Sequence, residues 1–445
     1  MSLMRGSGSR GGAICQRDRP PPARIDPIQR VTGMADLKSK LRSMVGGGPV
    51  KEQEPEPMQA VSGPDWQEID GELQSNDDGH YILRHKRFPL EFNHGIEIGS
   101  FLDLTAQDLV YLAKDARLAQ ASPESLLLLD TETTGLAGGT GTVPFMVGLA
   151  FFGDDHLHVE QYFLHELGHE RAMLRPIRER LESCSALVSF NGKTYDLPLL
   201  HNRLVLNRIK PVEIPHHIDL LHTVRRFWRR HLDSCSLQSI EQHVLGLQRT
   251  GDVPGALIPS LYFQFLRDRK LYPLKPVFQH NSMDLVSLVS FMTVIARFFG
   301  SPESLQHKHA DVMGTIRTLD DLGLGDELEA FFQRLFELDI PADEEVTILR
   351  AQNLKRLNRW QDAIHLYHDM IENGRRLHFH AYIELAKIYE HRQRDFDKAL
   401  DMVQRAQKRL ELYKELQAID EILHLEHELL HRLKRITAKR QRILS

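Results

Sequence analysis

The most constraining feature of the sequence is a run of four leucines at positions 126–129 that leads directly into Asp130 and Glu132. A short, wholly apolar run of this kind predicts a buried β-strand. Strand-like and helical segments alternate around it between about residues 79 and 304, which is typical of the α/β class. The expected strands cover residues 126–130, 143–152, 156–164, 186–191 and 216–221, and the expected helices cover about 170–183, 197–208, 220–231, 236–245, 260–270 and 282–299.

The composition divides the chain into three parts. Residues 1–78 combine Gly, Ser, Arg and Pro with an acidic segment, KEQEPEPM, and are expected to be disordered because they hold too little apolar surface to form a core. Met34 precedes a helix-like segment and is an alternative start of the chain. After residue 304 the strand signals stop, so residues 305–445 are expected to form an all-α domain behind an α/β domain at 79–304.

The C-terminal part contains a loose internal repeat. Ala363 and Tyr367 occupy the same helical positions as Ala399 and Val403, 36 residues later, and each of these helices follows another one. The arrangement resembles the helix pairs of tetratricopeptide repeats, whose period is about 34 residues. Such helices imply a surface that recruits a protein partner.

Charge and cysteine usage exclude several classes of protein. The formal net charge is −5, so the chain as a whole does not attract nucleic acid, and such binding requires local basic patches. The three cysteines form no CxxC pair, which argues against a disulfide framework and a thiolate zinc site. No apolar run reaches the about 18 residues of a membrane helix and no secretory signal opens the chain, so the expected location is the cytoplasm.

Two carboxylates lie at the end of the leucine strand. Asp130 and Glu132 are two residues apart, and alternation along a strand places them on the same face. Two negative charges so close resist joint ionisation unless a cation neutralises them, and Mg²⁺ or Mn²⁺ is the natural partner of all-oxygen ligands. The alternative is that Asp130 and Thr131 only cap a turn at the strand end.

Two further acids stand near helix starts. Asp196 precedes Leu-Pro, where a role as an N-cap is the plain alternative to metal ligation. Asp284 begins a largely apolar helix, where the helix dipole alone would favour an acid. His280 precedes Asp284 by four residues, so the two share a face if the first turn includes His280. A histidine and an acid that converge beside other carboxylates suit proton transfer next to a metal.

Taken in order, these residues resemble the motifs of a known superfamily. D-T-E-T-T-G (130–135), S-F-N-G-K-T-Y-D (189–196) and H-N-S-M-D (280–284) are similar to motifs one to three of the DEDD, or DnaQ-like, exonucleases. The most similar branch is that of the YprB-like ribonuclease H-like domains, which share the glycine-rich continuation GLAGGTGTVPFMVG (135–148). The resemblance covers about residues 80–300 and implies a ribonuclease H-like mixed sheet flanked by helices.

The resemblance implies a two-metal-ion nuclease. Asp130, Glu132, Asp196 and Asp284 would hold two Mg²⁺ or Mn²⁺ ions, and His280 would act with Asp130 and Glu132 in catalysis by orienting or deprotonating the attacking water. Three residues separate His280 from Asp284, the spacing of the branch that carries tyrosine at this position, whereas the histidine branch usually has four. A structural cap on the last helix is therefore the alternative role of His280.

The same motifs imply how a substrate is held. Thr131, Gly135, Asn191 and Tyr195 are expected to contact a single-stranded end of DNA or RNA, which would be shortened from 3′ to 5′. A rival of a different class is a scaffold that binds nucleic acid without cutting it and recruits a protein partner through the C-terminal helices. Four acids at the ligand positions argue against that rival, because a retired site has no need of them.

Two sequences with a metal or phosphate signature have plainer explanations. H-E-L-G-H (165–169) matches the zinc-protease signature HExxH, but that motif works only on a helix. Here a strand-like run ends at Leu164 and Gly168 weakens any helix, so a zinc site is not expected. The glycine-rich segment 138–141 lacks the Gly-Lys-Ser/Thr ending of a P-loop and is either a substrate-edge loop or a flexible turn.

The segment R-R-F-W-R-R-H (225–231) mixes arginines with Phe227 and Trp228, a combination that grips phosphates and stacks on bases. An amphipathic helix, with the aromatic side chains inward and the arginines in solvent, is the favoured explanation.

Overall fold

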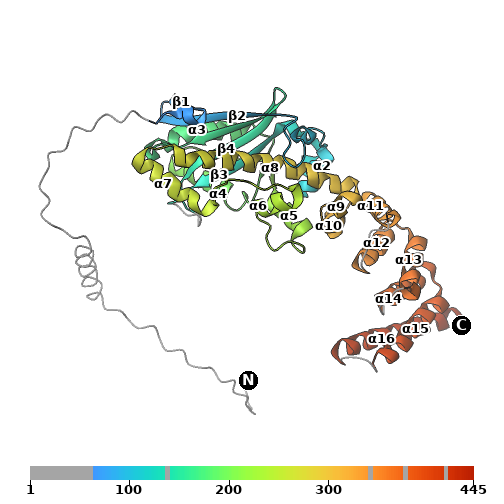
Figure 1. The fold of residues 1–445 in the computed structure, drawn as a ribbon. Coiled ribbons are helices and arrows are strands. Elements are labelled where there is room, and N and C mark those ends of the chain that lie inside the picture. Colours follow the sequence, from blue (N-terminus) through green and yellow to red (C-terminus); the bar gives the residue numbers. More distant parts are fainter. Residues whose placement is uncertain (1–63, 136–140, 339–343, 374–378, 415–418, 445) are drawn as a thin grey trace, which may run out of the picture. The chain divides into compact units, whose positions relative to one another are not determined.

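The computed structural model describes residues 64–135, 141–338, 344–373, 379–414 and 419–444 (Figure 1). Most of the segment for which the sequence predicts disorder, residues 1–63, lies outside the described residues, and so does the glycine-rich segment up to residue 140.

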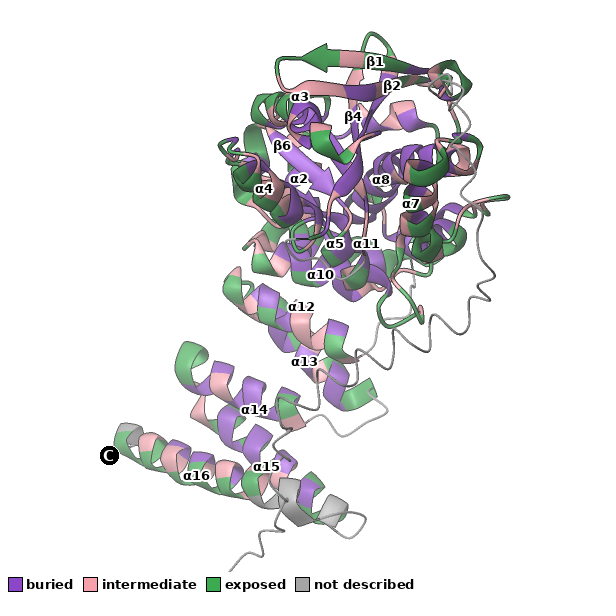
Figure 2. Ribbon diagram, turned by 90° about the vertical axis from the view of Figure 1, so that its left-hand side faces the viewer, coloured by how far each residue is buried: buried purple, intermediate pink, exposed green. Residues whose placement is uncertain are grey.

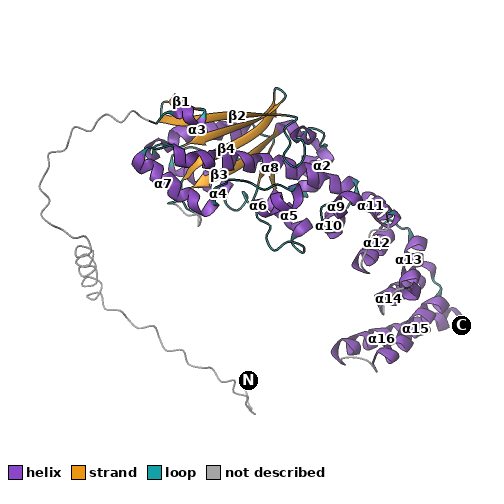
Figure 3. Ribbon diagram, viewed as in Figure 1, coloured by secondary structure: helices purple, strands orange, loops and turns teal. Residues whose placement is uncertain are grey.

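A seven-stranded mixed sheet is the framework of the α/β part, as the sequence predicts (Figure 3). The spatial order of its strands is β1-β2-β5-β4-β3-β6-β7. The leucine strand β3 pairs antiparallel with β4 on one side and parallel with β6 on the other. The strands are β1 (Gly71–Asn76), β2 (Gly79–Pro89), β3 (Leu126–Thr133), β4 (Pro144–Gly153), β5 (His156–Phe163), β6 (Ala186–Ser189) and β7 (His217–Asp219).

The expected helices are present, with differences at their ends. The strand expected at 216–221 stops at Asp219, because the Asp219 carboxylate caps the next helix by accepting the Leu221 N–H at 3.1 Å. The last helix of this part begins at Lys275, several residues before the expected start, so His280 lies inside it. The helices are α2 (Ala106–Ala113), α3 (Glu170–Ser183), α4 (Asp196–Leu206), α5 (Leu220–Trp228), α6 (Leu237–Ile240), α7 (Ile258–Asp268) and α8 (Lys275–Gly300).

Both faces of the leucine strand are buried, as Figure 2 shows for the central strands. Leu126 and Leu128 belong to one apolar cluster, with residues of α2, α5 and α8, whereas Leu127 and Leu129 belong to another, with residues of α3, α4 and α7. This alternation explains why the strand carries no polar residue before Asp130. Asp130 and Glu132 continue the face of Leu126 and Leu128, where α8 covers the sheet.

Among the described residues, the segment Tyr272–Gly300 is the one helical stretch long and apolar enough to span a bilayer. Its apolar window is 78% buried inside the protein, which is the environment of a core helix. The burial accounts for the apolar composition of α8.

The folded region begins before the residue expected from composition. Residues within 64–78 form the short helix η1 (Trp66–Ile69) and strand β1, so the expectation of disorder is wrong for this stretch. Strand β1 is an edge strand with mostly exposed, polar residues, and it gives no apolar alternation to detect. Trp66 packs against the rings of Phe163 and Phe265 and anchors the segment to the core.

The first helices after α8 share the core of the α/β part. They are α9 (Pro302–His307), α10 (Val312–Asp321) and α11 (Gly325–Glu337), and their apolar residues belong to the same cluster as α5 and α8. The closest approach is at Gly314, where a Cβ would lie 2.4 Å from the ring of Phe227. Trp228 donates its indole N–H to the Lys308 carbonyl at 3.0 Å. The aromatic pair Phe227 and Trp228 thus joins α5 to the C-terminal helices.

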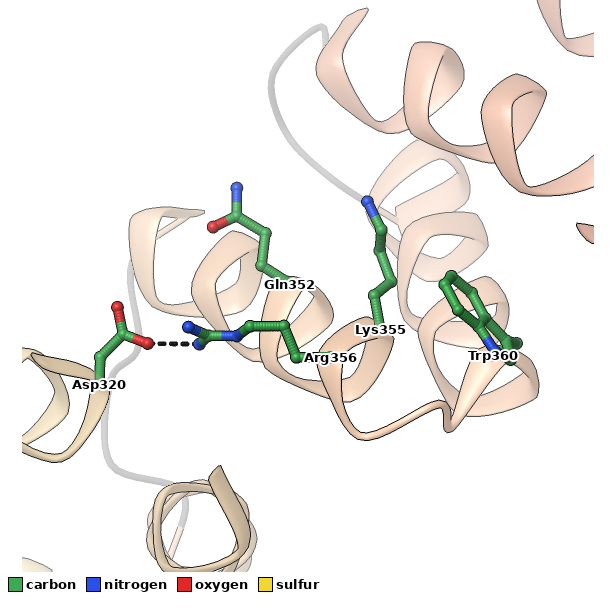
Figure 4. A pocket seen from close by; sticks show the side chains of 5 residues that line it. All are labelled: Asp320, Gln352, Lys355, Arg356 and Trp360. Atoms are coloured by element: carbon green, nitrogen blue, oxygen red, sulfur yellow. Dashed lines mark hydrogen bonds and ion pairs between the residues drawn. The ribbon is translucent and has the colours of Figure 1, made fainter. Parts of the chain in front are cut away.

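The remaining helices enclose a third apolar cluster. They are α12 (Glu344–Arg356), α13 (Trp360–Asn373), α14 (Phe379–Ile388), α15 (Phe396–Lys414) and α16 (Ile419–Leu444), and each contacts the next. The repeat residues Ala363, Tyr367, Ala399 and Val403 are all buried in this cluster, in keeping with stacked helix pairs. A cleft beside α12 is lined by Lys355, Arg356 and Trp360, and the Arg356 guanidinium reaches across to the Asp320 carboxylate of α10 (Figure 4).

The packing predicts where the chain can be divided. A fragment of residues 64–338 retains α10 and α11, so it should fold with a single cooperative thermal transition. A fragment of residues 64–304 would expose Phe227 and the surrounding apolar surface, so it should melt at a lower temperature and aggregate. Equal melting temperatures and equal solubility of the two fragments would show that the boundary after residue 304 is sufficient.

Candidate active site

Three elements bring four carboxylates to one end of the sheet. Asp130 and Glu132 end β3, Asp196 is the first residue of α4, and Asp284 lies in α8. Burial raises the pKa of Asp130 well above its usual value, and the charges of Asp284, Glu132 and Asp196 raise it further. Burial also raises the pKa of Glu132, with Asp284 and Asp196 again adding to the effect. The four acids therefore share one electrostatic environment.

Asp196 is buried, with 6% of its surface exposed, and it makes one short contact to β3. The Thr131 hydroxyl donates a hydrogen bond to the Asp196 Oδ1. Burial raises the pKa of Asp196 to about 6, although the hydrogen bond from Thr131 opposes the rise. Asp196 does not cap its own helix, because it is the first residue of α4 and Tyr195 occupies the N-cap position.

A row of polar residues crosses four strands behind Asp130. Asp130 of β3 faces Gly148 of β4, Gly148 faces Gln161 of β5, and Gln161 faces Arg84 of β2. Paired residues lie on the same face of the sheet, and α8 passes over this face. Gly148 leaves a gap in the row, and the side chain of Asn281 from α8 fills it, because a Cβ on Gly148 would lie 2.3 Å from the Asn281 Oδ1.

Asn281 completes a directed chain of hydrogen bonds across this gap. Arg84 Nη1 donates to Gln161 Oε1 at 2.7 Å, Gln161 Nε2 donates to Asn281 Oδ1 at 2.8 Å, and Asn281 Nδ2 donates to Asp130 Oδ2 at 2.7 Å. Each amide is thereby fixed in one orientation. The chain ends on a carboxylate oxygen of Asp130, so it positions that side chain from behind.

A second group of charges surrounds Asp284. Arg249 Nη2 lies 2.6 Å from Asp284 Oδ1 and also forms an ion pair with Glu241, while Arg249 Nη1 lies 3.5 Å from Asp252 Oδ2. Burial lowers the pKa of Arg249, but the charges of Asp284 and Glu241 outweigh burial and the net shift is upward. The segment that carries Arg249 follows a π-turn at Glu241–Leu245, which takes the place of the second half of the expected helix 236–245.

His280 lies between two carboxylates. Its Nδ1 is 2.8 Å from Asp252 Oδ1, and its Nε2 is 3.6 Å from Asp284 Oδ2. Both residues lie in α8, so the four-residue spacing puts them on one face, as the sequence predicts for a helix that includes His280. Asp252 comes from the loop that also carries Arg249, and it fixes the direction of the imidazole ring.

The four residues expected to contact substrate are held by internal hydrogen bonds. The Tyr195 hydroxyl donates to the Gly135 carbonyl at 2.7 Å, which ties the end of motif one to motif two. Asn191 has a left-handed backbone (φ 69°), and its N–H donates to the Asp219 Oδ1 at 2.8 Å. Thr131 is engaged by Asp196, as described above. These contacts shape the loops, and a substrate role of the four residues stays a prediction.

Sequence reasoning missed several residues of the site. Arg249, Asp252, Glu241 and Asn281 lie beside the predicted acids, and Asp219 organises the loop of motif two by accepting the N–H groups of Asn191 and Lys193. For Asn281 the sequence offers one indication, because this residue directly follows His280 in motif three.

The two aromatic residues of the arginine-rich segment do not form a surface on which nucleic-acid bases could stack. Phe227 and Trp228 are 0% and 1% exposed, so stacking on a nucleic acid is excluded and the amphipathic-helix interpretation is confirmed. The interpretation is wrong for Arg226, which is not in solvent, because its guanidinium donates to the carbonyl of Leu112 and to the Thr318 hydroxyl at 2.8 Å.

The donor set fits hard divalent cations. Burial raises the pKa values of Asp130, Glu132 and Asp284. Among the described residues, Arg249 is the main positive charge that offsets the mutual repulsion of these carboxylates. Asp284 Oδ1 is paired with the Arg249 guanidinium at 2.6 Å, which leaves Oδ2 on the side of His280. Oxygen ligands in such a group suit Mg²⁺ or Mn²⁺.

Comparison with known proteins agrees with this geometry. Residues 127–296 match the RNase H superfamily. The chain is also 30% identical over 339 residues to an uncharacterized protein of Bacillus subtilis (strain 168), YprB, and the alignment covers 74% of this chain and 81% of the relative. The chain belongs to the ribonuclease H superfamily. Membership suggests a nuclease-type function with nucleic acid as the ligand, and RNase H-like nucleases generally use divalent metals.

The buried acids of this RNase H-like domain predict a pH-dependent stability when divalent cations are removed. Asp196 titrates near pH 6 in the folded chain against 3.8 as an ordinary carboxyl, so the folded chain holds a proton that the unfolded chain has lost between these values. Stability therefore falls as pH rises through this window, by about 3 kcal/mol at about 1.4 kcal/mol for each pKa unit. In chelator, the melting temperature should fall between pH 4 and 7, and Mn²⁺ should restore it at pH 7.

Asp196→Asn removes the charge but keeps an oxygen that can accept from the Thr131 hydroxyl. In chelator, the melting temperature of this variant should therefore fall less between pH 4 and 7, and Mn²⁺ should raise it less at pH 7. Asp103→Asn, at an exposed acid remote from the hydrogen bonds of the site, is the matched control. The assignment fails if both variants follow the wild-type melting curve at every pH.

The Asn281 contact predicts a second effect. Asn281→Ala removes the donor to Asp130, and loss of a residue that orients a metal ligand typically lowers metal affinity or activity about 10- to 100-fold. Gly148→Ala should reproduce this loss, because the new Cβ displaces the Asn281 amide. Gly300→Ala, where nothing lies within 4 Å of an added Cβ, is the control. Mn²⁺ titrations of the three variants, followed by calorimetry, measure the effect; unchanged affinity in both Asn281→Ala and Gly148→Ala contradicts it.

Proposed function

We propose that the protein is a divalent-metal-dependent nuclease of the DEDD type that hydrolyses phosphodiester bonds, as a 3′-to-5′ exonuclease on single-stranded ends of DNA or RNA. The observation that carries the proposal is the convergence of Asp130, Glu132, Asp196 and Asp284 from three elements that are far apart in the sequence. Their order along the chain is similar to the three motifs of the DEDD exonucleases, and this similarity supports the exonuclease mode.

In this proposal the four carboxylates hold two Mg²⁺ or Mn²⁺ ions, which when bound activate the attacking water and stabilise the leaving oxygen. The protein supplies fixed ligand directions. Asn281 holds Asp130 from the sheet side, Thr131 holds one oxygen of Asp196, and Arg249 holds one oxygen of Asp284. Each hydrogen bond or ion pair leaves the other oxygen of its carboxylate for a cation.

His280 is proposed as the residue that takes the proton from the attacking water. With Nδ1 donating to Asp252, the free electron pair of the ring lies on Nε2, the nitrogen that faces Asp284. An imidazole oriented by a carboxylate in this way suits general-base catalysis. The competing role is structural, because the contact between His280 and Asp252 also ties α8 to the loop that carries Arg249.

The substrate end is proposed to lie against the segments of Thr131, Gly135, Asn191 and Tyr195, whose internal hydrogen bonds hold the two motif loops side by side. The tetratricopeptide-like helices α12 to α16 are proposed to recruit a protein partner, with the cleft of Figure 4 as one exposed feature of that region. The proposed nuclease activity does not depend on this proposed role of the C-terminal helices.

The decisive experiment is cleavage of end-labelled single- and double-stranded DNA and RNA in Mn²⁺ or chelator. Wild-type protein should shorten single strands from the 3′ end in Mn²⁺ alone, and Asp284→Asn should lower the rate by orders of magnitude while Asp103→Asn retains it. His280→Ala should lower the rate strongly but keep the rise in melting temperature that Mn²⁺ produces, because the carboxylates remain.

Several outcomes discriminate against the proposal. Binding of single strands without cleavage by the wild type would favour the non-cutting scaffold. Cleavage that persists in folded Asp284→Asn would refute the site assignment. Equal losses of rate and of melting temperature in His280→Ala would assign that residue the structural role.

A further inference from the structure

Three histidines that the carboxylate site does not use lie together at the beginning of β2. His80 is the second residue of β2, His165 follows the end of β5, and His169 ends the short helix η5 (Leu167–His169). One ring nitrogen from each of the three lies within 4.8 Å of the others. The ring centroids of His80 and His169 are 3.7 Å apart, and those of His80 and His165 are 4.8 Å apart.

Two buried ring nitrogens of this cluster have no hydrogen-bond partner among the described residues. His165 is 5% exposed, and its buried Nδ1 makes no hydrogen bond. The buried Nδ1 of His169 makes none either, and the nearest carboxylate oxygen, Glu166 Oε2, is 3.8 Å away. Buried polar atoms are normally paired, so two unpaired imidazole nitrogens within one cluster call for a ligand.

Two neighbours hold His165 in place. The rings of Trp66 and His165 meet edge to face at a centroid distance of 5.3 Å, and the Arg269 guanidinium donates to the His165 carbonyl at 2.8 Å. A metal ion binds imidazole through the free electron pair of a ring nitrogen, so it could pair with nitrogens that have no hydrogen-bond partner.

We propose that His80, His165 and His169 form a zinc site that is separate from the carboxylate site. Three imidazole nitrogens are a ligand set for Zn²⁺ and leave a fourth position for water. In a tetrahedral site with Zn–N bonds of about 2.1 Å, neighbouring nitrogens are about 3.4 Å apart, so the side chains must close by about 1 Å. His80 and His169 are only partly buried and can rotate, whereas His165 is held by its neighbours.

The site differs from that of a zinc protease, although two of its ligands belong to the sequence HELGH. His165 lies outside any helix and His169 ends a single turn, so the two imidazoles do not share a helix face as the protease motif requires. The third ligand comes from the preceding hairpin. Glu166 approaches His169 and the Arg269 guanidinium, both at 3.8 Å, which suits a residue that orients a ligand.

The zinc site would fasten the N-terminal hairpin to the sheet. His80 lies at the start of β2, which pairs with the edge strand β1, and the other two ligands lie in the connection from β5 to α3. In the sheet, β5 and β4 stand between β2 and the acids of β3. The inference therefore does not rest on the proposed nuclease function.

Zinc binding by the full-length chain tests the inference. The protein, carrying no histidine tag, is stripped with chelator and titrated with Zn²⁺ against a chromophoric zinc chelator, in Mg²⁺ at a concentration that saturates the carboxylates. We expect one zinc per chain and a rise in melting temperature. His80→Ala and His169→Ala should each weaken binding by more than the about 10- to 100-fold that loss of an outer-shell partner costs. Co²⁺ should give the intense visible absorption of four-coordinate nitrogen ligation, and both variants should lose it.

His85→Ala is the matched control, because His85 lies on the same strand and its Nε2 is 2.9 Å from Nδ1 of another histidine, His158, outside the cluster. It should bind zinc as the wild type does. Circular dichroism in chelator confirms that each variant is folded, and His80→Asn replaces any variant that is not. Absence of zinc binding by the wild type, or binding that survives in folded His80 and His169 variants, overturns the inference. Binding that Asp130→Asn abolishes would overturn it as well, since the zinc would then lie at the carboxylates.

Discussion

The hydrogen bond from Asn281 to Asp130 is the contact on which the architecture of the site depends. It joins the largely buried helix α8 to the end of the leucine strand, at the place where Gly148 lets a polar side chain reach the sheet. Asp284 and His280 lie on the same helix, so their positions relative to Asp130 follow from this junction. The apolar residues of α8 provide the free energy of packing, but apolar contacts alone would permit the helix to shift along the sheet. The buried amide of Asn281 prevents such a shift, because its donors and acceptors have defined partners.

Charge balance constrains the rest of the site. Four carboxylates in a buried volume repel one another, and a protein without a compensating cation would have to protonate some of them. Arg249 meets part of this demand by pairing with Asp284 and Glu241 at once. One guanidinium cannot neutralise four acids, and removal of one partner from a buried ion pair costs about 3–5 kcal/mol. The remaining negative charge is the physical basis of the divalent-cation requirement proposed above.

Much of the fold was predictable because it rests on periodicity. The leucine run, the strands that follow it and the helix at 170–183 are local patterns that a single sequence displays, and they lie where the sequence places them. The four acids were also recognisable, since Asp130 and Glu132 end a strand, Asp196 begins a helix and Asp284 follows in an apolar helix, in a fixed order along the chain. Edge strand β1 was not predictable, because its exposed polar residues show no alternation of apolar and polar side chains. The tryptophan that anchors this strand, Trp66, is a single apolar residue in a polar segment.

Residues that act through contacts distant in sequence escaped the sequence analysis for a physical reason. Arg249 and Asp252 lie in a loop, where no periodicity marks an inward side chain, and their roles depend on a π-turn that ends the preceding helix early. Glu241, in that turn, is 1% exposed and accepts a hydrogen bond from the Ser287 hydroxyl of α8.

The loop is thus fixed to α8 at both ends, by Glu241 through Ser287 and by Asp252 through His280. Helix α8, whose sequence is that of an apolar core element, therefore carries on one face Asp284, His280 and the Asn281 that orients Asp130. It also carries the attachment points of the loop that supplies Arg249. Because all of these lie on one rigid helix, a displacement of α8 would alter them together, and the site is assembled or lost as a unit.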